Sequence, residues 1–119
     1  RVFGSLAVSR SFGDSRFKEP KTSANFVSAD PAITVVNLTT SHKALVLACD
    51  GLWDVCDYNE VASYLTKLRN EGNDAQQIAE RLVQLAMDSR TEDNVTVVVV
   101  LFDWSDGGAE EPDQGQENE

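Results

Sequence analysis

Residues 44–55, ALVLACDGLWDV, join a continuous apolar run to a short acidic segment. The run from Ala44 to Cys49 has the length of an ordinary strand and is apolar on both faces, so it predicts a strand buried on both sides. Asp50-Gly51 closes the run with a turn signal, and Gly51 is expected to allow a tight bend there. The stretch therefore predicts an interior strand that ends beside carboxylates.

A second run of the same kind, VTVVVVLF, occupies residues 95–102. Side chains alternate between the two faces of a strand, and here both sets are apolar. A sheet that is apolar on both faces needs a covering layer on each side. The two runs together predict a sheet enclosed between layers.

Two amphipathic helices are predicted between these strands. Asp57 followed by Glu60, and Asp74 followed by Gln77, have the spacing of helix N-terminal capping boxes. Gly72 is expected to end the first helix, and the second is expected to run to about residue 88. These helices can cover one face of the sheet, but no segment of the chain is suited to the other, so a layer is missing. The apolar stripes are Tyr58, Val61, Ala62, Leu65 and Leu68, and Ile78, Ala79, Leu82, Leu85 and Ala86.

The first 40 residues give weaker signals. The apolar residues near 4–9 predict a strand, Gly13-Asp14 a turn, and the polar segment 15–25 a loop. The β-branched run 33–38 predicts another strand. Residue 1 is Arg rather than Met. Together with the uncovered sheet face, this predicts that the chain is a piece of a longer protein.

Charge is distributed unevenly along the 119 residues, whose formal net charge is −10. Residues 103–119 contain seven acidic and no basic residues. Such a composition cannot bury enough apolar surface to order itself, so an acidic disordered tail is favoured over a docking or autoinhibitory segment. The acidic balance also argues against a nucleic-acid partner, which requires clustered Lys and Arg.

Several other classes of protein are excluded or disfavoured. The sequence has no run of about 18 apolar residues that would predict a transmembrane helix, and it has no recognisable signal peptide. Cys49 and Cys56 do not form a metal-binding pair, and Cys49 is interpreted as a small hydrophobe. The lone His42 lies in a polar connector and is expected to be exposed. These features favour an intracellular protein of the cytoplasm or nucleus.

Acidic residues are placed where two strands would bring them together. Asp50 follows the first strand, and Asp93-Asn94 precedes the last. If these strands pair antiparallel, Asp50 and Asp93 meet at one edge, where carboxylates need a shared proton or cation. Hard oxygen ligands suit Mg²⁺ or Mn²⁺, and Asp54 is one turn away. The alternative is that these aspartates form turns or cap helices, with Asn94 a plain turn residue.

Three segments resemble ordered motifs of the eukaryotic metal-dependent Ser/Thr phosphatases, the protein phosphatase 2C family. They are RVFGSLAVSRSFGD at 1–14, ALVLACDGLWDV at 44–55 and EDNVTVVVV at 92–100. They occur in the family's order, with two helices between the second and third. The resemblance implies an α+β fold, an αββα sandwich of two antiparallel sheets flanked by helices, of which residues 1–102 are the C-terminal part of the catalytic domain.

The resemblance also implies roles for individual residues. Asp50 and Asp93 match the metal-binding aspartates of the family's DG-x-WD and DN motifs, and Asp54 matches the residue that helps to hold a weakly bound additional metal. Asp14 matches a structural or near-site position. The implied reaction is hydrolysis of phosphoserine or phosphothreonine in proteins, by a hydroxide generated at two Mn²⁺ or Mg²⁺ ions.

Family features expected upstream are absent from this sequence. There is no DGHGG motif, whose aspartate bridges the metals, and no match to the phosphate-binding arginine, so we expect no catalytic residue in this chain. Arg90 stands in a turn where many members have Gly. The longer parent is expected to be active and the chain alone inactive. The alternative is a non-catalytic module, a short product or pseudophosphatase, that binds phosphoproteins or a phosphatase partner.

Overall fold

The computed structural model describes residues 1–104 of the chain. These residues form two compact units, Arg1–Asn37 and a second that begins at Leu38. The second unit holds strands β1 (Ala44–Ala48) and β2 (Val97–Leu101) and helices α1 (Asp50–Trp53), α2 (Tyr58–Asn70) and α3 (Ala75–Asp88). Both predicted strands and both predicted amphipathic helices are therefore present. None of the helices in residues 1–104 is long and apolar enough to cross a membrane.

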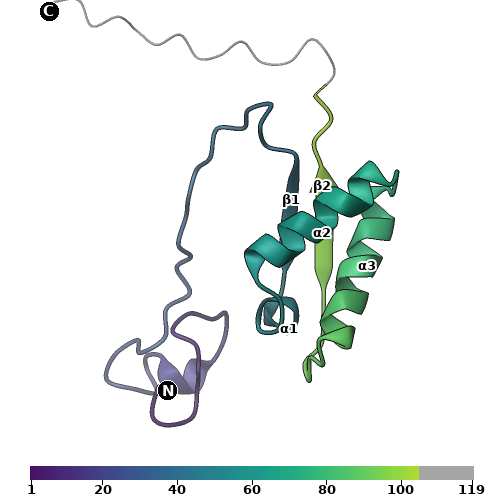
Figure 1. The fold of residues 1–119 in the computed structure, drawn as a ribbon. Helices are drawn as coiled ribbons and strands as arrows, with labels where there is room; N and C mark the ends of the chain where they lie inside the picture. Colours follow the sequence, from purple (N-terminus) through teal and green to yellow (C-terminus); the bar gives the residue numbers. More distant parts are fainter. Residues whose placement is uncertain (105–119) are drawn as a thin grey trace, which may run out of the picture. The chain divides into compact units, whose positions relative to one another are not determined.

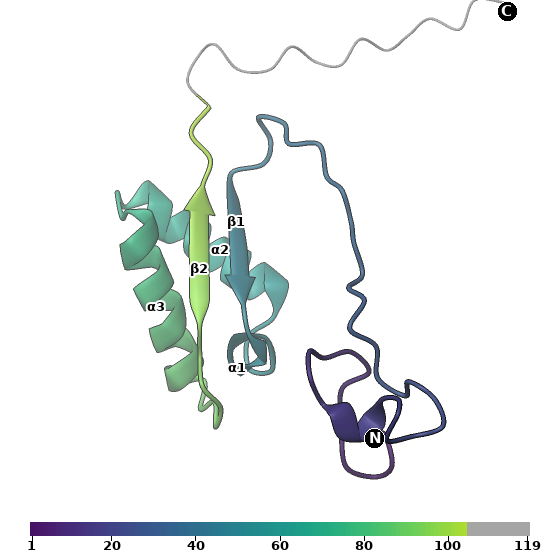
Figure 2. The same ribbon diagram turned by 180° about the vertical axis from the view of Figure 1, so that it is seen from behind.

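The two strands pair antiparallel, with Ala44 opposite Leu101 and Ala48 opposite Val97. Helices α2 and α3 lie across one face of the pair, as Figure 1 shows, and Figure 2 shows the strands from the side that these helices leave open. The strand residues that face the helices pack against the core: Ala44, Val46, Ala48, Val97, Val99 and Leu101. The helices contribute its buried centre, which includes Val61, Leu65, Leu68, Ile78, Leu82 and Ala86.

The other face of the strand pair is exposed. Leu45, Leu47, Val98 and Val100 are 44%, 55%, 50% and 40% accessible to solvent. An apolar surface of this kind is costly to leave in water, and contiguous patches usually mark an interaction site. Within the described residues the sheet thus has one covering layer and one bare apolar face, as the two-faced strand pattern predicts.

Aspartate side chains cap both long helices, and of the two predicted capping boxes the one at α3 forms in full while α2 has its Asp57 half. The Asp57 carboxylate accepts hydrogen bonds from the backbone N–H groups of Asn59 and Glu60 at 2.8 and 2.9 Å. At α3 the capping box between Asp74 and Gln77 is complete in both directions. Because the first N–H groups of a helix lack intrahelical partners, these caps fix where each helix starts.

Arg69, near the end of α2, ties the helix to the strands. Its guanidinium donates to the carbonyls of Lys43 and Phe102 at 2.6 and 2.8 Å, one residue outside each strand. Phe102 N–H also donates to the Lys43 carbonyl. The planar fork of arginine suits two acceptors at once. This contact closes the strand pair at the end away from α1.

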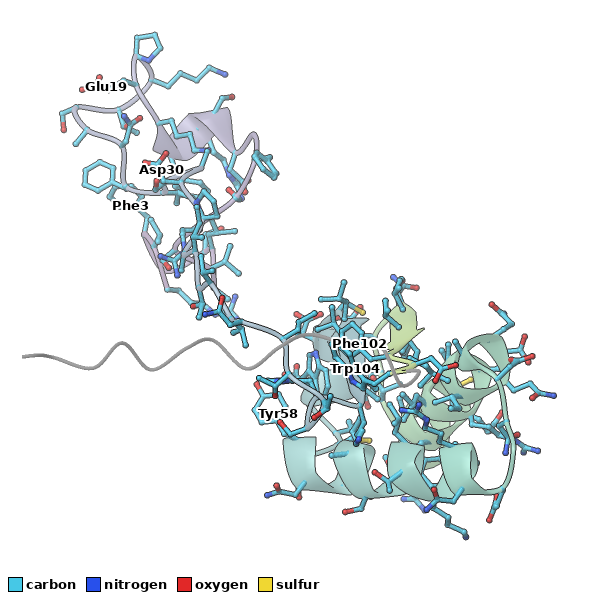
Figure 3. All side chains as sticks on the ribbon, turned by 90° about the horizontal axis from the view of Figure 1, so that it is seen from above. Phe3, Glu19, Asp30, Tyr58, Phe102 and Trp104 are labelled. Carbon is cyan, nitrogen blue, oxygen red and sulfur yellow. The ribbon has the colours of Figure 1, made fainter. Side chains whose placement is uncertain are left out.

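Residues just after β2 continue to make contacts. The indole N–H of Trp104 donates to the His42 carbonyl at 2.7 Å, and its ring packs on Phe102 with centroids 5.9 Å apart. Figure 3 shows the labelled Phe102 and Trp104 side by side. His42 itself accepts the Thr39 N–H at Nδ1 in a turn of the connector. The predicted acidic tail lies outside the described residues from 105 onward.

The strands predicted in the first 40 residues are wrong. Around residues 4–9 the structure has only isolated bridges, Val2 to Leu6 and Arg10 to Ser28, and residues 33–38 form no strand. Ile33 and Val35 are 81% and 85% exposed. A strand needs a neighbour for its N–H and C=O groups, and β-branched residues favour strands mainly through packing on that neighbour. Residues 33–38 have no such neighbour among the described residues, and around residues 4–9 the pairing stops at single bridges.

Arg90 adopts a backbone conformation that normally favours glycine. Its φ is 62°, in the left-handed region. Arg90 N–H donates to the Met87 carbonyl at 3.0 Å and Thr91 N–H to the Ala86 carbonyl at 3.1 Å, the two bonds of a Schellman motif that ends α3. The turn therefore keeps its geometry without glycine, at a conformational cost of roughly 1–2 kcal/mol.

Replacing Arg90 by Gly is expected to raise the free energy of unfolding by about 1 kcal/mol. The gain comes from relieving the left-handed strain and is partly offset by the larger entropy of glycine in the unfolded chain. Urea denaturation followed by circular dichroism would measure it. Arg81→Gly is the matched control, because Arg81 lies exposed within α3, where the same change costs about 1 kcal/mol. Equal losses in both variants would contradict the prediction.

Candidate metal centre

The strand register brings the acidic segments to one end of the sheet. Beyond the last β1–β2 pair, the Cys49 N–H donates to the Thr96 carbonyl at 3.2 Å, so the pairing continues one residue further. Asp50 follows at once as the first residue of α1, and Asp93-Asn94 lie just before Thr96. Figure 1 shows α1 at the end of β1 where β2 begins. The antiparallel pairing expected from sequence is thus confirmed.

The side chains of Asp50, Asp54 and Asp93 are all exposed, and the three residues make different local contacts. Asp50 begins α1, and Asp54 ends it, with its N–H donating to the Asp50 carbonyl at 2.8 Å. The Asp93 carboxylate accepts the N–H of Asn94 at 2.7 Å, a local turn interaction. Asp57, rather than Asp54, caps α2. The capping alternative therefore does not hold for Asp54, and Asp93 has a turn-forming contact.

Gly51 has a different role from the one predicted. It lies inside the helical turn of α1 and is buried. A Cβ built on it would overlap the carbonyl oxygen of Asn94 and lie 3.0 Å from the carbonyl carbon. Close approach of the Asn94 backbone, rather than a tight bend, thus requires glycine here. The approach brings α1 directly against the loop that carries Asp93.

Trp53 anchors α1 to the strand before it. Its indole N–H donates to the Ala48 carbonyl at 3.0 Å, and its ring packs on Tyr58 with centroids 5.0 Å apart. Leu52 beside it is fully buried in the core. The short helix that begins at Asp50 is therefore held in place by the Trp53 hydrogen bond to β1 and by the burial of Leu52 in the core.

Sequence reasoning missed the contacts of Cys49. Its thiol accepts the Thr96 N–H at 3.3 Å and is placed to donate to the Asn94 carbonyl at 3.2 Å. The only signal in the sequence is its position, between an apolar strand and the first acidic residue. From composition alone, such a cysteine is interpreted as a small hydrophobic residue.

The donors at this end of the sheet have the chemistry that Mg²⁺ or Mn²⁺ requires, since all are carboxylate oxygens. Within residues 1–104, however, no group of three or more His, Cys, Asp or Glu side chains is arranged to hold a metal ion. The described residues therefore show no metal site, and the assignment of Asp50, Asp54 and Asp93 as ligands stays a prediction. Asp14 lies in the other unit, before the short helix η1 (Ser15–Phe17), with a left-handed φ of 50°.

The chain matches the family model for protein phosphatase 2C over residues 1–95. It is 45% identical over 102 residues to protein phosphatase 2C homolog 1 of Saccharomyces cerevisiae, covering 86% of this chain and 33% of that protein. It is 43% identical over 105 residues to protein spalten of Dictyostelium discoideum, covering 88% and 11%. The chain thus spans a third or less of the length of these relatives.

A solved structure shows the same fold. The crystal structure of serine-threonine phosphatase 2C from Toxoplasma gondii superposes with a TM-score of 0.70 and 30% sequence identity, covering 82% of this chain and 30% of that one. The helices over an antiparallel strand pair are accordingly part of an α+β sandwich that is incomplete here. With a family model matched over residues 1–95 and this structural likeness, the chain belongs to the protein phosphatase 2C family.

Proposed function

We propose that this chain is the C-terminal part of a catalytic domain that hydrolyses phosphoserine and phosphothreonine in proteins. The observation that carries the proposal is the antiparallel register that brings the segments of Asp50 and Asp93 to one end of the β1–β2 pair. Family membership supports the reaction class, and the named relatives include protein phosphatases. We place the parent protein inside the cell, in the cytoplasm or nucleus.

Asp50 and Asp93 would hold Mn²⁺ or Mg²⁺ in that domain, and Asp54 would help with an additional, weaker ion. Such ions supply a metal-bound hydroxide at neutral pH and neutralise charge on phosphoryl oxygens. This chain's own contribution is to present carboxylates from two segments that the fold has already brought together. The remaining ligands would come from the upstream part of the domain, which carries the family's DGHGG motif.

The bare face of the strand pair supports this division of the domain. Leu45, Leu47, Val98 and Val100 offer an apolar surface on the side away from α2 and α3. In the proposed protein the upstream part packs there and completes the sandwich, as apolar burial favours. Phosphoproteins would be the substrates of the assembled domain.

A non-catalytic role is the second candidate. It would make the chain a binding module for phosphoproteins or a phosphatase. The three aspartates argue for the enzyme, because a module without catalysis has no need of Asp50, Asp54 and Asp93 together. The two candidates differ in whether an assembled domain hydrolyses phosphoproteins and needs the three aspartates to do so.

The isolated chain is expected to show no measurable Mn²⁺-dependent hydrolysis of an aryl phosphate, because it supplies only part of the ligands. A colourimetric assay at millimolar Mn²⁺ would measure this. Robust turnover that disappears in Asp50→Asn would contradict the expectation.

The proposal itself is tested with a chimera. Residues 1–102 of this chain would replace the segment that they match in the yeast relative, which makes up 33% of that protein, and the rest of that protein would supply the remainder of the domain. Mn²⁺-dependent dephosphorylation of a phosphothreonine peptide by the folded chimera supports the enzyme. A folded chimera that binds the peptide but does not hydrolyse it favours the non-catalytic module.

A further inference from the structure

Cys49 lies between β1 and α1, and its backbone N–H and carbonyl form hydrogen bonds in different elements. Its N–H donates to the Thr96 carbonyl at 3.2 Å, which makes Cys49 and Thr96 a hydrogen-bonded pair of the antiparallel ladder. In such a pair the second bond normally runs from the opposite N–H back to the carbonyl. Here the Cys49 carbonyl instead accepts the N–H of Leu52 at 3.2 Å, in the turn that forms α1.

The thiol takes the place of that carbonyl. Cys49 Sγ accepts the Thr96 N–H at 3.3 Å and lies 3.2 Å from the Asn94 carbonyl oxygen, to which the S–H donates. Cys49 is also the N-cap residue of α1, yet its side chain makes no capping hydrogen bond there. The thiol therefore acts across the strands and not within its own helix.

Cys49 itself and one of its two contacts, Asn94, are next to proposed metal ligands. Asp50 follows Cys49 directly, and the Asn94 whose carbonyl the thiol contacts donates its N–H to the Asp93 carboxylate at 2.7 Å. On the same side, Gly51 lets the Asn94 carbonyl come against α1. The thiol thus binds the Asn94 loop and Gly51 leaves room for it, at the two positions that flank Asp50.

We infer that Cys49 is a positioning residue for the metal centre: its thiol fixes the spacing between the Asp50 and Asp93 segments. The inference rests on the proposed function, since it assigns a purpose to that spacing. Groups that orient metal ligands through hydrogen bonds commonly change metal affinity by 10–100-fold when removed. A hydroxyl can both donate and accept, as the thiol does, so serine should preserve the role.

The test uses the 119-residue chain labelled with ¹⁵N, with four variants. Cys49→Ala removes the thiol, and Cys49→Val removes it while keeping a strand-compatible side chain of similar size. Cys49→Ser is the conservative replacement. Cys56→Ala is the matched control, because Cys56 is a buried thiol of the same unit whose Sγ lies 3.8 Å from the Ser89 hydroxyl. Amide shifts in α2 and α3 identify variants that remain folded.

Two readouts are needed, neither of which is enzymatic activity. Hydrogen exchange of the Thr96 amide reports the thiol contact, and paramagnetic broadening of amides near residues 50–54 and 93–96 gives the Mn²⁺ dissociation constant. We expect Cys49→Ala and Cys49→Val to accelerate Thr96 exchange and to raise that constant about tenfold or more. Cys49→Ser should remain within about threefold of the unsubstituted chain, and Cys56→Ala should not change the constant.

The outcomes separate the inference from the proposed function. If the unsubstituted chain binds Mn²⁺ at these residues and a folded Cys49→Ala or Cys49→Val binds it equally well, the inference fails alone. If Cys56→Ala weakens binding as much as Cys49→Ala, the effect is one of general stability and the inference also fails. If Mn²⁺ broadens no amide near Asp50 in the unsubstituted chain, the same variants are compared in the chimera with the yeast relative. Equal Mn²⁺ affinity of the folded Cys49→Ala chimera and the unsubstituted chimera overturns the inference alone, and an unsubstituted chimera that binds no Mn²⁺ there overturns the metal site of the proposed function.

Discussion

Asp50→Asn in the chimera with the yeast relative is expected to lower kcat by at least about a hundredfold. A metal ion supplies several kcal/mol of charge stabilisation in such reactions, and each 1.4 kcal/mol, roughly, is a factor of ten in rate. Asparagine keeps the shape of the side chain but loses the charge that holds a divalent cation. The assay is Mn²⁺-dependent release of phosphate from a phosphothreonine peptide, with Mn²⁺ varied to separate affinity from turnover.

Asp57→Asn is the matched control for that experiment. Asp57 is exposed and lies in the same segment, but its carboxylate caps α2, and asparagine caps helices about as well as aspartate. Its kcat should stay within about twofold of the unsubstituted chimera. The metal-ligand role of Asp50 would be rejected if Asp50→Asn kept most of the activity, or if Asp57→Asn lost as much.

The second large effect is expected from Gly51→Ala. The added methyl group would overlap the Asn94 carbonyl oxygen, which is backbone and cannot rotate away. Overpacking of this kind costs typically 1–3 kcal/mol and sometimes more, and here the clash falls between a buried helical turn and the loop at the start of β2. We expect a loss of about 3 kcal/mol in the free energy of unfolding, measured by urea denaturation.

Gly72→Ala separates steric overlap from backbone conformation. Gly72 has a φ of 88°, yet a Cβ there would meet no atom within 4 Å. Its substitution should therefore cost only the left-handed penalty of roughly 1–2 kcal/mol. A Gly51→Ala variant as stable as the unsubstituted chain would mean that α1 and the Asn94 loop are not packed as described.

Local signals in the sequence were sufficient for most of the second unit. The apolar runs at 44–49 and 95–102 predict β1 and β2, and the spacings from Asp57 and Asp74 predict where α2 and α3 begin. These predictions succeed because a cap or an apolar periodicity acts within a few residues. The bare face of the strand pair also follows from the sequence, since both strands are apolar on both sides.

The candidate site was predictable only in part. That Asp50 and Asp93 share one end of the sheet follows once the strands are taken as antiparallel, and the register bears this out. Their binding of metal remains a prediction, and within residues 1–104 no three-donor group is formed. The ligands of a metal site usually come from distant parts of a chain, so a short segment can suggest such a site without forming it.

The sequence by itself determined the secondary structure of the second unit, the caps of its helices and the acidic residues beside the ends of its strands. Only the tertiary structure decided that Gly51 is needed for the Asn94 backbone and that the Cys49 thiol replaces a carbonyl in the ladder. It also decided that the β-branched run at 33–38 forms no strand. The physical reason is common to all three: caps and periodicity are set by near neighbours, whereas close approach and strand pairing depend on residues far away in the chain.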